Sequence, residues 1–359
     1  MNAILPATSI RSAQANAVRV LMIDDSVVVR SVVAGIFARI SDVELVCTAG
    51  HLDEAYAFLA GQQADIILLD HEMPGQNGLD ALPQLLNAAR NAHVIMLSSH
   101  CQRGSKIAVA ALSLGASDAI AKPASGDSGQ QFADQLLMRI RRLAAAGRYR
   151  AADRAPIVHR PVPQGFRVEC IGIGASTGGI HALADLLGAL PGKPPVPILV
   201  TQHLPAPFIP HYARQVARMS HLPVSVAREG EELRPGHILI APGEASLSCW
   251  RDGGTVRVGL AHDCDPDTFT RPSVNHMFAG MARSYGAGAL GIVLTGIGRD
   301  GTAGGRAIVG EGGVVIAQDR PSCTIWGMPA SVAREGIASA LLAPSDIPHY
   351  LREKCGLPS

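Results

Sequence analysis

Three residues in the second half of the chain, Ser176, His203 and Asp300, are of the types that carry out acyl transfer in serine hydrolases. Ser176 lies in the stretch GASTG at 174–178, which fits the G-x-S-x-G pattern of a sharp turn that exposes a hydroxyl. A serine hydroxyl is unreactive at neutral pH unless an adjacent base, oriented by a third group, takes its proton. The stretch alone fits a helix cap equally well, so the hypothesis depends on the other two residues.

The positions of these residues relative to the predicted strands support the hypothesis. Apolar stretches at 168–173, 198–201 and 289–294 are expected strands, and Ser176, His203 and Asp300 each follow one of them. The carboxyl ends of parallel strands share one edge of a sheet, so the three side chains can converge there. Their order in the chain, Ser–His–Asp, differs from the Ser–Asp–His order of the α/β-hydrolases and disfavours that fold.

The stretch GIGRDG at 296–301 supports a competing interpretation. It fits a G-x-G-x-x-G phosphate loop between a strand and a helix, and Asp319 lies 18 residues after Gly301, as in a dinucleotide site. Against this, Asp300 would place a carboxylate beside the pyrophosphate at the helix N-terminus. A dinucleotide-binding output domain is therefore kept as the alternative function.

Polar residues also follow the predicted strands of the first half of the chain. Asp24 and Asp25 follow the first strand, Asp70 the third, Ser98 the fourth and Lys122 the fifth. Crowded carboxylates repel one another unless a cation joins them, and hard oxygen ligands suit Mg²⁺. An aspartate neutralised in this way can attack a phosphoryl group, while a hydroxyl and an ammonium hold the phosphate oxygens. Any one aspartate could cap a helix, but the whole set at strand ends favours a phosphoryl-transfer site.

Two α/β domains are needed to position these groups. Short strands rich in Val, Ile and Leu alternate with helical patterns in both halves, which predicts doubly wound parallel sheets covered on both faces. A β-hairpin is predicted around Asp252-Gly253-Gly254. We expect an N-terminal tail at 1–17, a first domain at 18–145, a linker at 146–166 and a second domain at 167–355. The expected strands are 18–23, 43–48, 65–69, 94–97 and 118–121 in the first domain and 168–173, 198–201, 237–241, 289–294 and 314–317 in the second. Helices are expected between the strands of the first domain, for example at 26–39 and 103–114, and at 179–190, 210–219, 274–285 and 302–309 in the second.

Composition excludes several classes of protein. The 359 residues are 47% apolar and 17% charged with a net charge of +1, which excludes an intrinsically disordered or strongly basic chain. Aromatic residues make up only 4%, which disfavours binding of nucleic acid by base stacking. Seven cysteines without a C-x-x-C pair fit a reducing cytoplasm. We identify neither a secretion signal nor a membrane span, and we expect a cytoplasmic protein.

The first half of the chain resembles the receiver domains of response regulators. The stretches that carry the resemblance are RVLMIDDS (19–26), IILLDHEMPGQNGLDAL (66–82), VIMLSSH (94–100) and GASDAIAKP (115–123). The resemblance implies a (βα)5 fold in which Asp70 accepts a phosphoryl group from a histidine kinase. It also implies that Asp24, Asp25, Asp70 and the carbonyl of Glu72 hold Mg²⁺, and that Ser98 and Lys122 sense the phosphate. Ala119 stands where many receivers carry an aromatic switch residue, which puts that mode of switching in doubt.

The second half resembles the catalytic domain of the chemotaxis protein-glutamate methylesterases (CheB family). The matching stretches are IGIGASTGG (171–179), TQHLPAPF (201–208), LRPGHILIAPG (233–243), RPSVNHMF (271–278), GIVLTGIGRDG (291–301) and VVIAQDRPSCTIWGMP (314–329). The resemblance implies that Ser176 is the nucleophile, His203 the base and Asp300 its orienting group. Backbone N–H groups of Thr177 and Ile297 are expected to form the oxyanion hole. The esterase is expected to need no cofactor.

These two resemblances together imply a function. Receiver, linker and esterase in this order are the architecture of the methylesterase family. Its substrates are glutamyl methyl esters on the cytoplasmic domains of methyl-accepting chemoreceptors, which are hydrolysed to glutamate and methanol, with deamidation of receptor glutamines as a second activity. We expect phosphorylation at Asp70 to regulate the esterase. Partners would be chemoreceptors and a chemotaxis histidine kinase, with neither nucleic acid nor membrane insertion involved.

Overall fold

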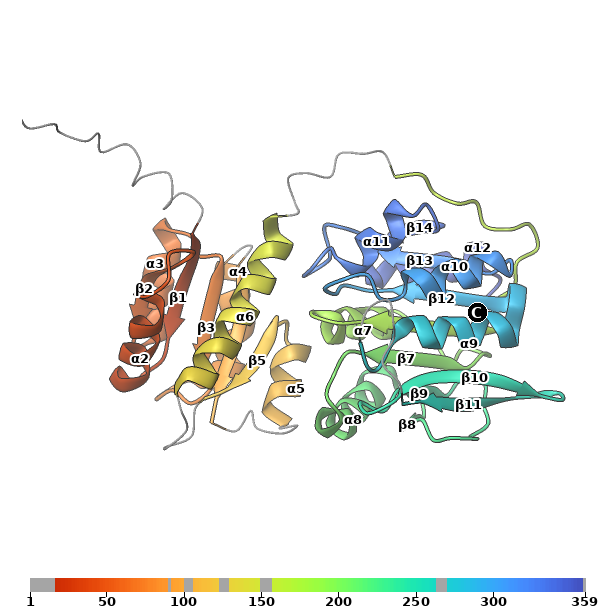
Figure 1. Cartoon of the computed structure of the whole chain (residues 1–359), viewed down its shortest axis with the longest axis horizontal. Coiled ribbons are helices and arrows are strands. Elements are labelled where there is room, and N and C mark those ends of the chain that lie inside the picture. The colour runs from red at the N-terminus through yellow and green to blue at the C-terminus, as the bar shows by residue number, and fades with distance from the viewer. Residues whose placement is uncertain are drawn as a thin grey trace, which may run out of the picture. The chain divides into compact units, whose positions relative to one another are not determined.

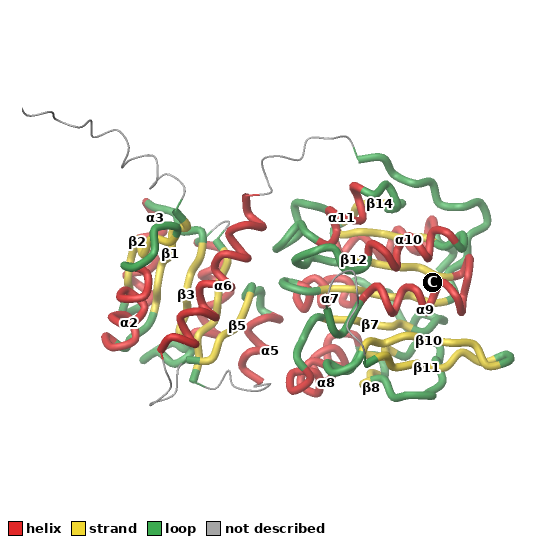
Figure 2. Tube along the Cα trace, viewed as in Figure 1, coloured by secondary structure: helices red, strands yellow, loops and turns green. Residues whose placement is uncertain are grey.

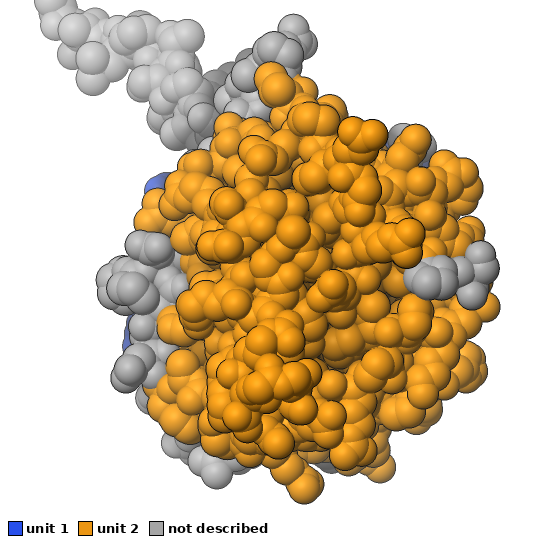
Figure 3. All heavy atoms as spheres, turned by 90° about the vertical axis from the view of Figure 1, so that its right-hand side faces the viewer, with its two compact units in different colours: residues 1–102, 110–148 blue, residues 103–109, 149–359 orange. Residues whose placement is uncertain are grey.

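The computed structural model describes residues 17–89, 92–99, 106–122, 129–148, 157–262 and 270–357. The chain forms two compact units, one of residues 1–102 and 110–148 and the other of residues 103–109 and 149–359 (Figure 3). Among the described residues no helix is long and apolar enough to cross a lipid bilayer. The two units are described separately below.

The first unit is built on one parallel sheet. Its strand order is β2-β1-β3-β4-β5, as Figure 1 shows, and every neighbouring pair of strands is parallel. Each residue of β3 is buried, so helices must cover the sheet on both faces. The elements up to residue 148 are β1 (Val18–Ile23), α2 (Val27–Phe37), β2 (Val43–Ala49), α3 (Leu52–Gly61), β3 (Ile66–Asp70), α4 (Gly78–Ala88), β4 (His93–Ser98), α5 (Lys106–Ser113), β5 (Asp118–Ala121) and α6 (Gly129–Arg148).

The second unit is a larger α/β fold. A parallel sheet of order β14-β13-β12-β6-β7-β9-β8 forms its core, and β10 and β11 pair as an antiparallel hairpin (Figure 2). Its strands are β6 (Cys170–Ala175), β7 (Ile198–Gln202), β8 (Val224–Val226), β9 (Ile238–Ile240), β10 (Ser246–Asp252), β11 (Thr255–Ala261), β12 (Ala289–Val293), β13 (Val314–Gln318) and β14 (Ala340–Leu342). Its α-helices are α7 (Gly179–Gly188), α8 (Ile209–Ser220), α9 (Val274–Tyr285), α10 (Thr302–Gly310), α11 (Met328–Arg334) and α12 (Ile347–Lys354).

The predicted fold class is confirmed, including both parallel sheets and the hairpin. Strands β1 and β5 and helix α9 have the predicted bounds, and the other strands given bounds above are displaced by one or two residues at one or both ends. Strands β8 and β14 and helices α11 and α12 were not predicted. Each of these two strands is only three residues long and lies at an edge of the sheet, so it lacks the apolar run that identifies a central strand.

Helix α9 packs unusually close to the sheet because glycines face it. A Cβ atom at Gly174 of β6 would lie 2.3 Å from Cγ1 of Val274, the first residue of α9. A Cβ at Gly172 would lie 2.4 Å from Sδ of Met281, and one at Gly304 of α10 only 2.7 Å from the carbonyl oxygen of Asn275. Real Cβ atoms do not approach so closely, so the glycines set the distance between helix and sheet.

Candidate active site

The carboxyl edge of the second sheet brings together the strand ends that carry Ser176 and His203. Strands β6 and β7 are neighbours in a register that pairs Ala175 with Gln202. Each candidate residue comes directly after one of these paired positions, and the backbone N–H of His203 donates to the carbonyl of Ala175 at 3.0 Å. The predicted convergence of these two residues therefore follows from strand register alone.

Asp300 reaches the same edge from the loop after β12, which is the other neighbour of β6. Its Oδ2 lies 2.8 Å from Nε2 of His203, and the carboxylate is almost completely buried while 16% of the His203 side chain is exposed. The same loop also packs against Ser176, since a Cβ at Gly296 would lie 2.6 Å from Cβ of Ser176. The hypothesis that three separate loops meet at one edge is thus consistent with the structure.

The carboxylate of Asp300 is held mainly by the N-terminus of α9. Burial by itself would raise the pKa of Asp300, but hydrogen bonds from His203 and from the backbone N–H groups of Val274 and Asn275 outweigh it and lower the pKa. The donor distances are 2.8 Å from Val274 N, 2.9 Å from Asn275 N, 2.9 Å from Gly301 N, 3.2 Å from Ser273 Oγ and 3.0 Å from Thr270 Oγ1. The N-terminus of a helix favours negative charge, so the anionic form is stabilised.

Sequence reasoning missed these residues, although one signal was readable. Ser273 directly precedes the predicted helix at 274–285 and caps it, because its Oγ accepts from His276 N at 3.4 Å. Asn275 adds a second layer, since its Oδ1 accepts from the N–H groups of Gly301 and Gly304, both at 2.9 Å. The cap at Ser273 was therefore readable but was not predicted, and nothing in the sequence indicates that the capped helix end lies on Asp300.

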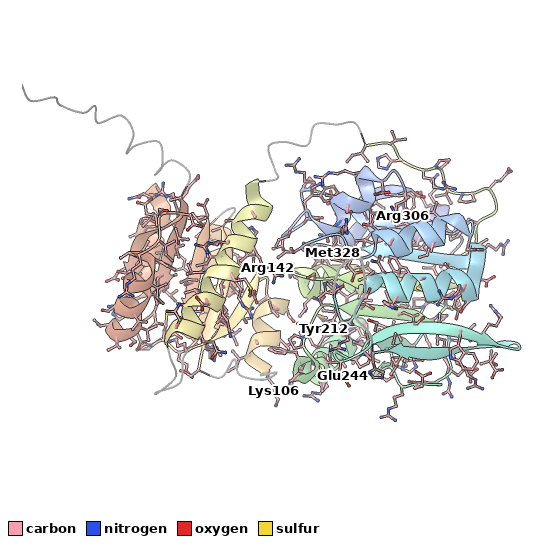
Figure 4. The ribbon with its side chains drawn as sticks, in the orientation of Figure 1. Lys106, Arg142, Tyr212, Glu244, Arg306 and Met328 are labelled. Atoms are coloured by element: carbon pink, nitrogen blue, oxygen red, sulfur yellow. The ribbon has the colours of Figure 1, made fainter. Side chains whose placement is uncertain are left out.

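The loop that carries Ser176 is held at consecutive backbone groups. The Ser176 N–H donates to the carbonyl of Thr295 at 3.0 Å, and the Ser176 carbonyl accepts from Gln202 Nε2 at 2.8 Å and from Gly179 N at 2.9 Å. The carbonyl of Thr177 accepts from Thr295 Oγ1 at 3.1 Å. Met328, labelled in Figure 4, packs against the neighbouring loop after β12, because its Sδ would lie 2.5 Å from a Cβ at Gly296. The backbone around the serine is therefore fixed from both neighbouring strands.

The first unit places its polar residues at the carboxyl edge of its own sheet. Carboxylate oxygens of Asp24, Asp25 and Asp70 lie within 4.8 Å of one another, and Nζ of Lys122 bridges Asp24 at 2.9 Å and Asp70 at 2.7 Å. Burial and, to a lesser extent, the charge of Asp24 raise the pKa of Asp70 despite the lysine. Burial would lower the pKa of Lys122, but its bonds to the two aspartates outweigh burial and raise it.

The other residues predicted for this edge lie there as well. Ser98 is buried and pairs in register with Ala121, the residue before Lys122, whose N–H donates to the Ser98 carbonyl at 3.2 Å. Glu72 follows Asp70, and its N–H donates to Asp70 Oδ1 at 3.2 Å. The chemistry of this set, hard carboxylate oxygens beside a single ammonium, fits Mg²⁺.

The loop at 296–301 does not have the form of a dinucleotide site. Its carboxylate, Asp300, already accepts from the N–H of Gly301, which is the N-cap of α10. A pyrophosphate at this helix N-terminus would meet a buried, ionised group. The alternative of a dinucleotide-binding output domain is therefore not supported.

The first unit is a receiver-type sheet with an acidic cluster at its carboxyl edge. The second is an α/β unit with a serine, a histidine and an aspartate beyond adjacent strands. This combination defines a response regulator with a serine-hydrolase output. Residues 20–132 match the response regulator receiver domain, and residues 171–351 match the CheB methylesterase family. The chain belongs to the CheB methylesterase family and carries its receiver domain.

Relatives of known name agree with this assignment over almost the whole chain. A protein-glutamate methylesterase/protein-glutamine glutaminase of Rhodospirillum rubrum is 35% identical over 93% of this chain and 94% of its own length. One of Chromohalobacter salexigens is 37% identical, with 94% of this chain and 96% of that protein covered. The crystal structure of the CheB methylesterase catalytic domain of Thermotoga maritima matches with a TM-score of 0.50 and 36% identity, covering 52% of this chain and 98% of that one.

Proposed function

We propose that this enzyme hydrolyses glutamyl methyl esters on the cytoplasmic domains of methyl-accepting chemoreceptors and releases methanol, with deamidation of receptor glutamines as a second activity. The single observation that carries the reaction class is the 2.8 Å contact between His203 and the buried Asp300 beside the strand that ends at Ser176. The names of the relatives support the substrate.

In the proposed reaction, His203 takes the proton of Ser176 as Oγ attacks the γ-carbonyl carbon of the ester. The tetrahedral intermediate collapses and the imidazolium protonates the departing methoxide. Water, activated by the same imidazole, then hydrolyses the acyl-enzyme and frees Ser176. Asp300 holds one ring nitrogen of His203 throughout, and its lowered pKa keeps it ionised while the imidazole carries its transient charge.

Two backbone N–H groups are available for the oxyanion. Within the ranges that the structure describes, neither Thr177 N nor Ile297 N is bonded to an acceptor, and both residues are partly exposed. Thr177 lies in the loop that carries Ser176, and Ile297 lies in the loop after β12 that packs against it. Preorganised donors of this kind stabilise the negative charge that develops in the transition state, and one donor is typically worth about 3 kcal/mol.

The receiver supplies the regulation in this proposal. Asp70 would accept the phosphoryl group from a chemotaxis histidine kinase, and Ser98 and Lys122 would bind its oxygens. Asp24, Asp25, Asp70 and the carbonyl of Glu72 would hold Mg²⁺, which supplies positive charge to the phosphoryl oxygens when bound. Phosphorylation would shift the two units toward an arrangement that admits substrate. The domain boundaries at 18–145, 146–166 and 167–355 remain part of this proposal.

The deciding experiment compares wild type and Ser176→Ala for methanol release from a methylated cytoplasmic fragment of a chemoreceptor. The variant should lose turnover by several orders of magnitude while still binding the fragment. Equal rates for the two proteins would remove the assignment of Ser176. Ammonia release from a glutamine-bearing fragment, measured for wild type and Ser176→Ala, tests the deamidase activity.

A further inference from the structure

Gln202 is a buried amide beside the nucleophile to which the proposed reaction gives no part. It is the last residue of β7, only 2% of it is exposed, and it lies opposite Ala175 in the sheet. Its Nε2 donates to the carbonyl oxygen of Ser176 at 2.8 Å. The side chain therefore contacts the backbone of the nucleophile rather than its hydroxyl.

The contact determines which way the next peptide N–H points. In a trans peptide group the C=O and the N–H lie in one plane and point in opposite directions. The Ser176 carbonyl points toward Gln202 on β7, so the Thr177 N–H of the same peptide points away from β7. No residue in the described part of the chain accepts a hydrogen bond from this N–H, which leaves it available to an anion.

The amide of Gln202 has only one workable orientation. Reversing it would set its oxygen against the Ser176 oxygen, and two acceptors would repel. In the observed orientation Oε1 is buried and has no partner among the described residues, which is an unfavourable state for an acceptor. Gly179, the first residue of α7, makes room for it, because a Cβ there would lie 2.6 Å from Oε1. The fold thus tolerates a buried unsatisfied oxygen so that the N–H end can hold Ser176.

We propose that Gln202 is a positioning residue that fixes the Ser176–Thr177 peptide and thereby aims the Thr177 N–H at the oxyanion of the ester-hydrolysis intermediate. This inference rests on the proposed function and deepens it. A residue of merely structural importance would affect folding, whereas Gln202 should affect the transition state more than the bound substrate. The N–H of Gly179 also holds the Ser176 carbonyl, at 2.9 Å, so removal of Gln202 should weaken the alignment without abolishing it.

The test uses Gln202→Met, which removes the donor at similar size, and Gln202→Glu, which places a carboxylate against the carbonyl. Thr201→Val is the matched control, because Thr201 is the preceding buried residue of β7 and its Oγ1 donates to Met277 Sδ, away from the nucleophile loop. In the full-length protein we expect kcat to fall about tenfold for Gln202→Met, less than the 10²–10³-fold loss typical of a deleted oxyanion donor. Gln202→Glu should lose more, and KM should stay within about twofold in both.

Two further readouts separate positioning from folding. An alkylboronic acid forms a tetrahedral adduct with a serine, and its affinity should fall in parallel with kcat. The acid limb of the pH profile of kcat/KM should stay where it is in wild type, because His203 is not altered. Thermal unfolding checks that each variant is folded. A folded Gln202→Met with the kcat of Thr201→Val would overturn the proposal, as would a loss confined to KM. If Ser176→Ala keeps full activity instead, the proposed function itself fails.

Discussion

Asp70 and Asp300 are the buried carboxylates at the sheet edges of the two units, yet their pKa values are shifted in opposite directions. Both are almost fully buried, and both lie at the carboxyl edge of a parallel sheet. Asp300 accepts several neutral N–H and O–H donors in addition to His203, and its pKa is lowered. Among the described residues, Asp70 accepts one backbone N–H and shares Lys122 with Asp24, and its pKa is raised. Burial therefore does not determine the charge of a carboxylate; the local donors do.

The opposite pKa shifts of Asp70 and Asp300 suit the two different roles that are proposed for these carboxylates. A carboxylate surrounded by fixed donors is a stable anion with no unused lone pairs, which suits a group that only orients an imidazole. A carboxylate that is buried with few donors and a second acid beside it is a high-energy anion, which suits a nucleophile and a cation ligand. The following predictions test this contrast from the largest expected effect to the smallest.

Replacing Asp300 by Asn should lower kcat by about 10⁴-fold, because an amide cannot hold the required tautomer of His203. The amide NH₂ would also face the N–H groups of α9, so the variant should unfold at a lower temperature. Methanol release and calorimetry measure the two effects. Asp185→Asn, at an exposed position on α7, is the control and should change neither kcat nor the unfolding temperature. A loss of kcat below about tenfold for Asp300→Asn would show that Asp300 is not the orienting group.

Replacing Asp70 by Asn should abolish the activation of the esterase by a phosphodonor and leave basal hydrolysis within about twofold of wild type. The reason is that an amide cannot form the acyl phosphate, while the esterase unit contains its own reacting groups. Steady-state turnover with and without a small-molecule phosphodonor measures this. Stimulation that survives in the variant would contradict the role of Asp70.

Addition of Mg²⁺ should stabilise the receiver unit, because a cation offsets the repulsion among Asp24, Asp25 and Asp70. At one hundred times the dissociation constant the stabilisation should be about 2.7 kcal/mol, visible as a rise of several degrees in the receiver's thermal transition. Asp25→Asn should remove most of this rise and Asp53→Asn, at an exposed site on α3, should keep it. An equal response in both variants would place the cation elsewhere.

The smallest effect concerns stability and pH. Because the pKa of Asp70 is raised above its ordinary value of 3.8, ionisation costs the folded state more than the unfolded one, and the cost appears as pH rises through this range. Asp70→Asn should therefore make the receiver slightly more stable at pH 7, with the gain disappearing near pH 3. For Asp300 the sign is reversed: its contribution is present above pH 3.8 and is lost as pH falls through its lowered pKa. A gain for Asp70→Asn that grows toward low pH would contradict this account.

Most of the site was predictable because strand ends are readable in the sequence. The strands that end near Asp24, Asp70, Ser176 and His203 are central and apolar, and parallel pairing then places the residues after them at one edge. The bounds of β1 and α9 were predicted without error because β1 is a nearly continuous apolar run and the apolar residues of α9 recur at helical spacing.

The hydrogen bonds that set the charge of Asp300 were beyond sequence reasoning. Val274 and Asn275 are 26 and 25 residues away from it, and their donors are backbone groups that any residue carries. The Gln202 contact was not predicted either, because the predicted strand ended at residue 201 and the sequence pattern assigned no role to Gln202. Local sequence predicts where an element ends, but tertiary packing decides what that end touches.

The glycines beneath α9 have a consequence for how the enzyme can vary. The same strand, β6, carries Ser176 beyond its end and has no side chain at Gly172 or Gly174, where α9 lies against it. A methyl group at 174 would start 2.3 Å from Val274, well inside the ~3.5–4.0 Å at which carbon atoms rest, so the helix would have to retreat by an ångström or more. Its first N–H groups would then be out of reach of Asp300. The absence of a Cβ at these two glycines therefore sets the distance between α9 and β6, and this distance keeps the helix N-terminus within hydrogen-bonding range of Asp300. A Gly→Ala change in this core should lower the catalytic rate before it unfolds the protein.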